Sequence, residues 1–350
     1  MTRSAAHRMA DVKRIVGAAR AIVESIAKDD LVSRLASSTG LSNEGVERAL
    51  TRHLETSASD ADIAKLVERA GNADRVTVIL SSNVFIGALR ALAVARAASE
   101  NVVLRPSTRE PLFAELLVLA VQAAGDKNVS LVREIDVAEI DAGEIHVYGR
   151  DDTVADVRAH ARVPVKGHGT GMGLAWITRE ANLQATARAL TDDTVAFDQR
   201  GCLSPRIALV AGGDARASAF AEALHAELER IGKRVPRGTL PREERARSER
   251  YIDTMTYAGH AIVGHDHVIG VATVAAPLTL PPPYRHLHIA PCSDREDAEE
   301  KVASVAGAVL AFGSDDPAEA KAFAPSWARV SVLGVMQRPP LDGPIDLREK

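Results

Sequence analysis

The segment RVTVILSSNVFIGALRALAVARAASENVVLRP, residues 75–106, carries the clearest structural pattern in this 350-residue chain. Residues 75–80 and 101–104 are short runs rich in β-branched side chains, which are typical of buried strands, whereas residues 84–98 have the pattern of a helix. A strand, a helix and a second strand at this spacing predict a parallel βαβ unit. Such sheets bind ligands at the carboxyl ends of their strands, so the loops after these two strands are the first places to expect a site.

The same alternation continues towards the C-terminus, and the chain before residue 75 has helical spacing. Ser42 and Ser59 are candidate N-caps for two of the early helices. A second region of strands and helices begins near Asp198, so the predicted fold class is α/β. The further expected strands are 129–133, 145–149, 163–165, 172–177, 206–210, 261–264, 268–275, 284–289 and 329–334, and the further helices are 110–124, 153–160, 215–232, 241–250, 294–303 and 316–324.

The composition excludes several classes of protein. The formal net charge of −4 argues against a chain whose main task is to bind nucleic acid or anionic lipid. Aromatic residues make up only 3% of the chain, so a base-stacking surface is not expected. The first residues lack the apolar core of a secretory signal, and no run approaches the length of a membrane span. Two cysteines are too few for a disulfide framework, and they indicate a reducing compartment, the cytoplasm.

Cys202 is the first candidate for chemistry. It lies in FDQRGCLSPRIALV, residues 197–210, where a glycine precedes it at the entrance to an apolar run. Such a junction can offer backbone N–H groups to a thiolate or to an oxyanion. The local sequence alone leaves two interpretations open, a nucleophile or a buried structural cysteine. Cys292, in APCSDRE, lies between an expected strand and a helix, and it is interpreted as structural.

Two other patterns are weaker. Five histidines invite a zinc interpretation, but no carboxylate-rich ligand set accompanies them in a recognisable order, so a structural or surface role is the prediction. Four glycines alternate strictly before the strand expected at 172–177, which is not a phosphate-binding pattern and predicts a turn with close backbone approach. The histidines are His260, His265, His267, His286 and His288, and the glycines are Gly167, Gly169, Gly171 and Gly173.

Several short segments, taken in order, resemble the aldehyde dehydrogenase superfamily. The most similar branch is the acyl-CoA reductases, the fatty-acyl reductase family of bacterial bioluminescence. The resemblance covers about residues 75–340, and its evidence is the order and spacing of the segments rather than any one of them. The segments are SNV (82–84), VLRPS (103–107) followed by Pro111, VYGR (147–150), VPVKGHG (163–169), DQRGCLSP (198–205) and GVMQRPP (334–340).

The resemblance implies an aldehyde-dehydrogenase-like fold, with a Rossmann-like cofactor domain and an α/β catalytic domain. We expect residues 1–197 to hold the N-terminal helices and the dinucleotide-binding domain. Residues 198–328 would form the catalytic domain with the nucleophilic cysteine, and residues 329–350 a last strand and tail. The resemblance also implies an oligomer of identical chains.

The resemblance assigns Cys202 as the nucleophile and Asn83 as the side chain that binds the substrate oxyanion. A cysteine thiolate attacks an acyl thioester, coenzyme A leaves, and an acyl-enzyme remains. Reduction of that acyl-enzyme then gives an aldehyde. The superfamily's hydrolytic Glu has no counterpart, because residues 163–173 contain no carboxylate. His168 stands in that segment and is either an acid–base group or a turn histidine.

The same resemblance assigns cofactor contacts to Ser82, Arg105, Ser107 and Gly149. Arg105 replaces the family's usual Lys, and a guanidinium fork suits a ribose 2′-phosphate, which favours NADPH while leaving NADH open. The alternative for Arg105 is a surface arginine at the end of a strand. No metal is expected in the reaction.

The predicted function is the NAD(P)H-dependent reduction of an acyl-CoA or other acyl thioester to an aldehyde through an acyl-cysteine. One alternative is a CoA-acylating or semialdehyde dehydrogenase that acts on a small substrate. The other alternative is a non-catalytic scaffold subunit with the same fold. An acyl-activating partner enzyme would supply the thioester, and the acyl chain stays open.

Overall fold

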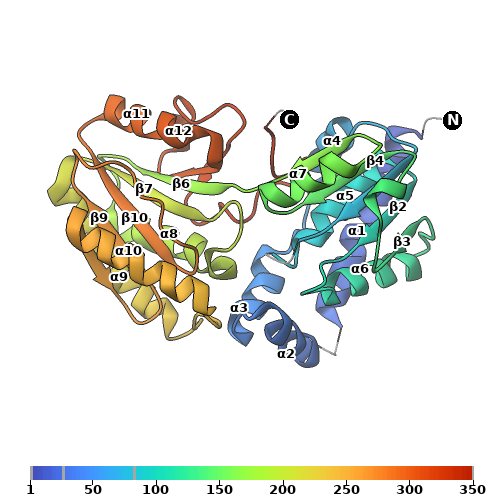
Figure 1. Ribbon diagram of the computed structural model, residues 1–350, viewed down its shortest axis with the longest axis horizontal. Helices are drawn as coiled ribbons and strands as arrows, with labels where there is room; N and C mark the ends of the chain where they lie inside the picture. The colour runs from blue at the N-terminus through green and yellow to red at the C-terminus, as the bar shows by residue number, and fades with distance from the viewer. Residues whose placement is uncertain (1–2, 26–27, 82–83, 349–350) are drawn as a thin grey trace. The chain divides into compact units, whose positions relative to one another are not determined.

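The computed structural model describes residues 3–25, 28–81 and 84–348 of the chain (Figure 1). The chain forms two compact units, each assembled from separate segments. The first unit contains Met1–Thr39, Ala49–Thr170 and Pro340–Lys350, and the second contains Gly40–Arg48 and Gly171–Pro339. Each unit is built around one mainly parallel sheet, so the α/β class predicted from the sequence is confirmed.

The first unit has a five-stranded sheet in the order β3-β2-β1-β4-β5, and every neighbouring pair is parallel. The carboxyl ends of all five strands therefore meet at one edge, as in other ligand-binding parallel sheets. The strands are β1 (Arg75–Ile79), β2 (Asn101–Arg105), β3 (Val129–Leu131), β4 (Glu144–Tyr148) and β5 (Val165–His168).

The helices of the first unit cover this sheet in layers. Helix α5, which connects β1 to β2, is buried at every position from Ala88 to Ala98 and lies between the sheet and α1. Burial on all sides explains its Ala-rich sequence, because small side chains let neighbouring backbones approach closely. The helices are α1 (Ala5–Glu24), α2 (Lys28–Thr39), α4 (Asp60–Arg69), α5 (Gly87–Ala98), α6 (Leu112–Ala123) and α7 (Asp151–His160), with the short turns η1 (Ala49–His53) and η2 (Val137–Glu139).

The second unit has a seven-stranded sheet in the order β12-β11-β6-β7-β10-β9-β8. Only β8 is antiparallel to its neighbour, and it forms one edge of the sheet. The strands are β6 (Met172–Ile177), β7 (Pro205–Ala211), β8 (Gly259–Val263), β9 (Val268–Ala272), β10 (His286–Cys292), β11 (Val309–Ser314) and β12 (Arg329–Val332).

The central strands of this sheet are buried on both faces. The fully buried Trp176 and Phe312 lie in a core that includes residues of β6, β7, β10 and β11 and of the helices α11 and α12. Helix α9 packs against β7, β9 and β10, and α10 packs against β8 and β9 (Figure 1). The helices are α3 (Asn43–Arg48), α8 (Leu183–Val195), α9 (Gly213–Gly232), α10 (Arg242–Ala258), α11 (Arg295–Val305) and α12 (Pro317–Lys321), with the turns η3 (Ala196–Gln199) and η4 (Ala306–Ala308).

The element types agree broadly with the sequence prediction, and three differences have a physical reason. The strand expected at 163–165 begins only at Val165, because Pro164 has no N–H to donate to a sheet. Helix α8 and strand β11 were not predicted. The sequence of α8 is rich in Ala and Thr and has little apolar period, and β11 follows Ala-rich turn sequence directly.

The boundary between the compact units lies at Thr170/Gly171, and not between residues 197 and 198 as expected from the sequence. The physical reason is that β6 pairs with β7 and β11 inside the second sheet, so residues 172–195 belong to that sheet's unit. The C-terminal tail also divides differently, because residues 340–350 return to the first unit. Within the described ranges, no helix is long and apolar enough to cross a membrane.

Candidate active site

Cys202 lies in the turn between η3 and β7, and its side chain is half-buried. The N–H of Ser204 donates to the carbonyl of Gly201 at 3.0 Å, which closes the turn around the cysteine. Cys202 therefore stands at an element junction, three residues before the first residue of a buried strand. A reactive cysteine needs such a partly exposed position, because a fully buried thiol meets no substrate.

The backbone before Cys202 is strained. Phe197, Asp198 and Gln199 all have positive φ, at 53°, 50° and 60°. Residues other than glycine rarely adopt this left-handed conformation, which costs on the order of 1 kcal/mol or more for each residue. Three such residues in a row persist only where surrounding contacts hold them, so their side-chain partners are part of the site.

Gln199 is the first of these contacts. Its buried side-chain amide donates from Nε2 to the carbonyls of Pro205 and His286, each at 2.6 Å. Its Oε1 accepts the N–H of His286 at 2.8 Å. The amide thereby spans from the first residue of β7 to the first residue of β10, and it ties the Cys202 turn to the sheet.

An ion pair between Asp198 and Arg285 is the second contact. Arg285 Nη2 lies 2.7 Å from Asp198 Oδ1, and both side chains are only 2% exposed. The pair is satisfied on all sides, because Asp198 Oδ2 accepts the N–H of Gly238 and Arg285 donates to the carbonyls of Val235 and Pro236. Arg285 also has positive φ, so the pair connects two strained segments.

Gly173 is the third element of the support. A Cβ at this position would lie 2.3 Å from the carbonyl oxygen of Leu203 and 2.9 Å from the nitrogen of Pro205. The N–H of Gly173 donates to the carbonyl of Ser204 at 2.8 Å. Only glycine allows β6 to approach the Cys202 turn this closely. The close-approach turn that the alternating glycines predicted is confirmed here.

Cys292 has the opposite environment. It is the last residue of β10 and is fully buried. Burial raises the pKa of its thiol to about 12, so the group stays protonated at neutral pH. A buried, protonated thiol is inert, in agreement with the structural role predicted for it.

The two residues Ser82 and Asn83, predicted to bind cofactor and oxyanion respectively, lie outside the described residues. They follow β1, which is the central strand of the five-stranded sheet. The other residues predicted to contact the cofactor, Arg105, Ser107 and Gly149, lie within the described part of the chain. All three belong to the first unit.

Arg105, Ser107 and Gly149 lie at or just beyond the carboxyl ends of β2 and β4. These strands flank β1, so the parallel sheet brings the three residues to one edge. Arg105 is half-buried, and the buried Ser107 accepts the N–H of Arg109 at its Oγ, at 3.2 Å. The N–H of Gly149 donates to the carbonyl of His168 at 3.1 Å.

His168 is the last residue of β5, and its ring is stacked on Tyr148 with the centroids 4.3 Å apart. Tyr148 is directly opposite it in the β4–β5 register, and burial raises the pKa of its phenol. The His146 ring lies edge-on to His168 at 6.4 Å. His168 thus belongs to an aromatic cluster at the carboxyl edge of the sheet, which limits how freely its ring can move.

The five histidines considered from the sequence are dispersed. His286 and His288 are buried in β10, and His265 is exposed. His267 instead lies beside two residues outside the predicted set, His225 and Glu229. Burial lowers the pKa of His267 to about 4, so its ring is uncharged at neutral pH. The spacing of His225 and Glu229, four residues apart on a helix, was the available signal for this cluster.

The local sequence does not show that Gln199, Asp198 and Arg285 hold the Cys202 turn. DQRGC contains the first two, but their roles depend on partners far along the chain. Arg285 is 87 residues from Asp198. Its signal in the sequence is only a charged residue before an apolar strand, which is common at any strand end.

The fold is that of the aldehyde dehydrogenases. The NAD-dependent benzaldehyde dehydrogenase of Corynebacterium glutamicum has 15% identity and a TM-score of 0.69, with 89% of this chain and 77% of that chain covered. An aldehyde dehydrogenase of Mycobacterium tuberculosis complexed with NAD+ has 19% identity and a TM-score of 0.68, with 93% and 77% covered. The NADP-dependent glyceraldehyde-3-phosphate dehydrogenase of Bacillus halodurans C-125 has 14% identity and a TM-score of 0.66, with 94% and 78% covered.

The family is shown by sequence. No curated protein matches the chain significantly. The family model described as acyl-CoA reductase (LuxC), however, matches residues 64–307, which is most of the chain and includes the Cys202 turn. The resemblance stated from the sequence is therefore confirmed, and this protein belongs to the LuxC family of acyl-CoA reductases, oxidoreductases that here have the aldehyde dehydrogenase fold.

Proposed function

We propose that this protein reduces an acyl-CoA or another acyl thioester to the aldehyde through a covalent acyl intermediate on Cys202. The observation that carries the proposal is the construction of the Cys202 turn. A half-exposed thiol is presented on a strained backbone that a buried amide, a buried ion pair and a glycine contact all hold in place. Strain held in this way is typical of functional sites.

The reaction begins with attack of the Cys202 thiolate on the thioester carbonyl carbon. A carbon–sulfur bond forms to the enzyme, and the carbon–sulfur bond to coenzyme A then breaks, which releases the coenzyme A thiolate. The backbone N–H groups of the turn and the Asn83 amide are the proposed donors to the oxyanion. Loss of one such donor costs about 10²–10³ in rate. Collapse of the later thiohemiacetal returns the Cys202 thiolate and releases the aldehyde.

A nicotinamide cofactor fits the carboxyl edge of the five-stranded sheet. Arg105, Ser107 and Gly149 gather there, and the guanidinium of Arg105 suits a phosphate. When bound, this cofactor supplies the hydride that brings the acyl group to the aldehyde level. Of the solved structures similar to this chain, one is complexed with NAD+ and one with NADP, so both forms occur on this fold. We propose NADPH, on the basis of Arg105.

The test uses the two cysteines as each other's control. With limiting iodoacetamide, Cys202 is expected to alkylate well before the buried Cys292, and prior incubation with an acyl-CoA is expected to protect it. Cys202→Ser is expected to lose reductase activity by several orders of magnitude, because a hydroxyl without an adjacent strong base is a poor nucleophile. Cys292→Ser is the matched control and is expected to keep the acyl label. Full activity in Cys202→Ser would remove the covalent mechanism.

The same experiment separates the two remaining functions. A CoA-acylating or semialdehyde dehydrogenase would be labelled by short acyl groups and would lose label as the acyl chain lengthens, whereas a scaffold subunit would take no acyl label at all.

We also propose that the protein forms a homo-oligomer, which light scattering on the purified protein tests. We further propose that a separate acyl-activating enzyme supplies the thioester substrate.

A further inference from the structure

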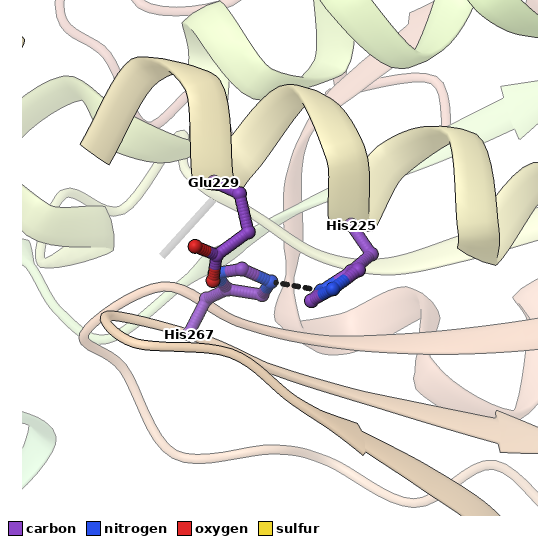
Figure 2. Close-up of side chains that lie close together, drawn as sticks. All are labelled: His225, Glu229 and His267. Carbon is purple, nitrogen blue, oxygen red and sulfur yellow. Dashed lines mark hydrogen bonds and ion pairs between the residues drawn. The ribbon is translucent and has the colours of Figure 1, made fainter. Parts of the chain in front are cut away.

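A second cluster of reactive side chains lies in the second unit, apart from the Cys202 turn. His225 and Glu229 come from α9, and His267 comes from the turn between β8 and β9 (Figure 2). His225 and Glu229 are four residues apart, so they share one face of the helix. Figure 2 shows all three side chains pointing toward one another. The cluster plays no part in the proposed reduction.

The candidate ligand atoms of the three residues lie near one another. Nδ1 of His225 lies 2.9 Å from Nε2 of His267, and one ligand atom from each of the three residues lies within 4.8 Å of the others. Zinc binds imidazole nitrogens at about 2.0–2.1 Å, which places two such nitrogens about 3.3 Å apart around a tetrahedral ion. The two rings would therefore need to separate by only a few tenths of an ångström.

The site is held in place by its surroundings. The His267 side chain is 1% exposed. Oε1 of Glu229 accepts the N–H of His265 at 2.8 Å, which fixes the carboxylate beside the rings. Gly264 packs closely against the cluster, because a Cβ at this position would lie 2.2 Å from Cε1 of His267 and 2.6 Å from Oε1 of Glu229. Partners of this kind orient metal ligands in known sites.

We propose that His225, Glu229 and His267 bind a divalent transition-metal ion, with Zn²⁺ the best match, and that the ion connects α9 to the β8–β9 turn. Two imidazoles and one carboxylate are a ligand set that zinc uses with a fourth position left for water or another ligand. The nitrogen-rich set disfavours Mg²⁺ and Ca²⁺, which prefer oxygen ligands.

The test is zinc binding to the full chain after removal of metal with a chelator. It is carried out in a Cys202→Ser background, because a half-exposed thiolate would itself bind zinc. Calorimetric titration is expected to give one ion for each chain, and added zinc is expected to raise the thermal unfolding midpoint by mass action. Addition of Co²⁺ is expected to produce visible d–d absorption.

Two variants test the ligands, and a third is their control. His225→Gln and Glu229→Gln are each expected to weaken zinc binding by at least about 100-fold, since even loss of a partner beyond the ligands costs 10–100-fold. His265→Gln is the matched control, because that side chain is 87% exposed and only its backbone contacts Glu229. Glu229→Gln keeps the acceptor for the His265 N–H, so it is expected to fold normally. Equal zinc affinity in all three variants, or no binding at micromolar zinc in the parent, would overturn the proposal.

Discussion

Around Cys202, single side chains far along the chain determine the local backbone. Gln199 makes three hydrogen bonds that no shorter or singly functional side chain reproduces, because it both donates to two carbonyls and accepts one N–H. The ion pair of Asp198 with Arg285 is fully hydrogen-bonded, which is the condition under which a buried pair is tolerated. The conformation of the Cys202 turn therefore depends on contacts with residues far along the chain.

Replacement of Gln199 by Glu tests this dependence. The carboxylate cannot donate to the carbonyls of Pro205 and His286, so we expect a stability loss of about 2–4 kcal/mol and a clear fall in the alkylation rate of Cys202. Gln122→Glu is the matched control, because Gln122 donates from Nε2 to the carbonyl of Val129 at 2.7 Å in the other unit. It should lose stability while Cys202 keeps its alkylation rate. An unchanged rate in Gln199→Glu would mean that the amide does not position the turn.

Arg105 is the residue that bears on cofactor choice. If the Arg105 guanidinium binds a 2′-phosphate, Arg105→Leu is expected to weaken the binding of NADPH by about 1.5–3 kcal/mol, the range for a hydrogen bond to a charged group. The binding of NADH is expected to stay nearly unchanged. Fluorescence titration of each cofactor measures this difference. Arg133→Leu, at a 78% exposed side chain, is the control. Equal losses of binding affinity for NADPH and NADH would contradict the assignment of Arg105 to the 2′-phosphate.

Among the elements, β10 is a buried strand that contains two histidines. His286 accepts from or donates to Ser248 at 2.7 Å and contacts the carbonyl of Pro283 at 2.8 Å, while His288 contacts the Tyr251 hydroxyl at 3.3 Å. Burial lowers the pKa of both histidines to about 4. The strand is therefore built around two neutral imidazoles, and protonation of either one opposes folding.

This strand makes stability depend on pH. The unfolded chain binds these two protons near pH 6.5 and the folded chain only near pH 4, so their contribution is present above pH 6.5 and is lost as pH falls toward 4. Each histidine contributes a slope of up to about 1.4 kcal/mol per pH unit. Urea unfolding at several pH values is expected to show the loss, and His288→Gln to reduce the slope. An identical slope in that variant would contradict the assignment.

Asp193 acts in the opposite direction over the same range. Burial raises the pKa of this carboxyl to about 7, although it accepts backbone N–H groups near Gly334. The folded state therefore holds a proton that the unfolded state releases near pH 4, so this group adds stability as pH falls from 7 toward 4. Asp193 therefore offsets part of the stability loss that the buried histidines cause on acidification.

At the scale of the whole molecule, each compact unit is assembled from segments that are not consecutive along the chain. Residues 40–48 belong to the second unit although residues on both sides belong to the first. The segment is bound there by the N–H of Thr239, which donates to the carbonyl of Gly40 at 2.8 Å, and by the ion pair of Arg48 with Asp192. Residues 340–350 likewise return to the first unit, where Arg90 donates to the carbonyls of Pro340 and Gly343.

A chain that ends at Pro339 tests the importance of this return. It removes two carbonyl acceptors of Arg90, whose side chain is 5% exposed, so we expect a loss of about 2–4 kcal/mol in stability. Chemical unfolding and limited proteolysis measure the effect, and a chain that ends at Arg348 is the control. Equal stability of the two shortened chains would show that the tail contributes nothing to the first unit.

Much of this protein is determined by neighbours in the sequence. The βαβ pattern, the α/β class and the N-caps at Ser42 and Ser59, whose hydroxyls accept the N–H groups of Gly45 and Asp62, follow from side chains a few positions apart. Such short-range patterns are set by backbone geometry and periodicity, which the sequence displays directly. The order of the short segments was also enough to identify the family.

Only the tertiary structure decided the partners of buried polar groups. Gln199 reaches His286 across 87 residues, and His225 meets His267 across 42. A polar residue must find a partner once it is buried, but nothing in its local sequence says which one, because that depends on how sheets and helices pack. The same reason applies to the unit boundary at Thr170 and to the returning tail, which the strand order and long-range contacts determine and the linear pattern does not.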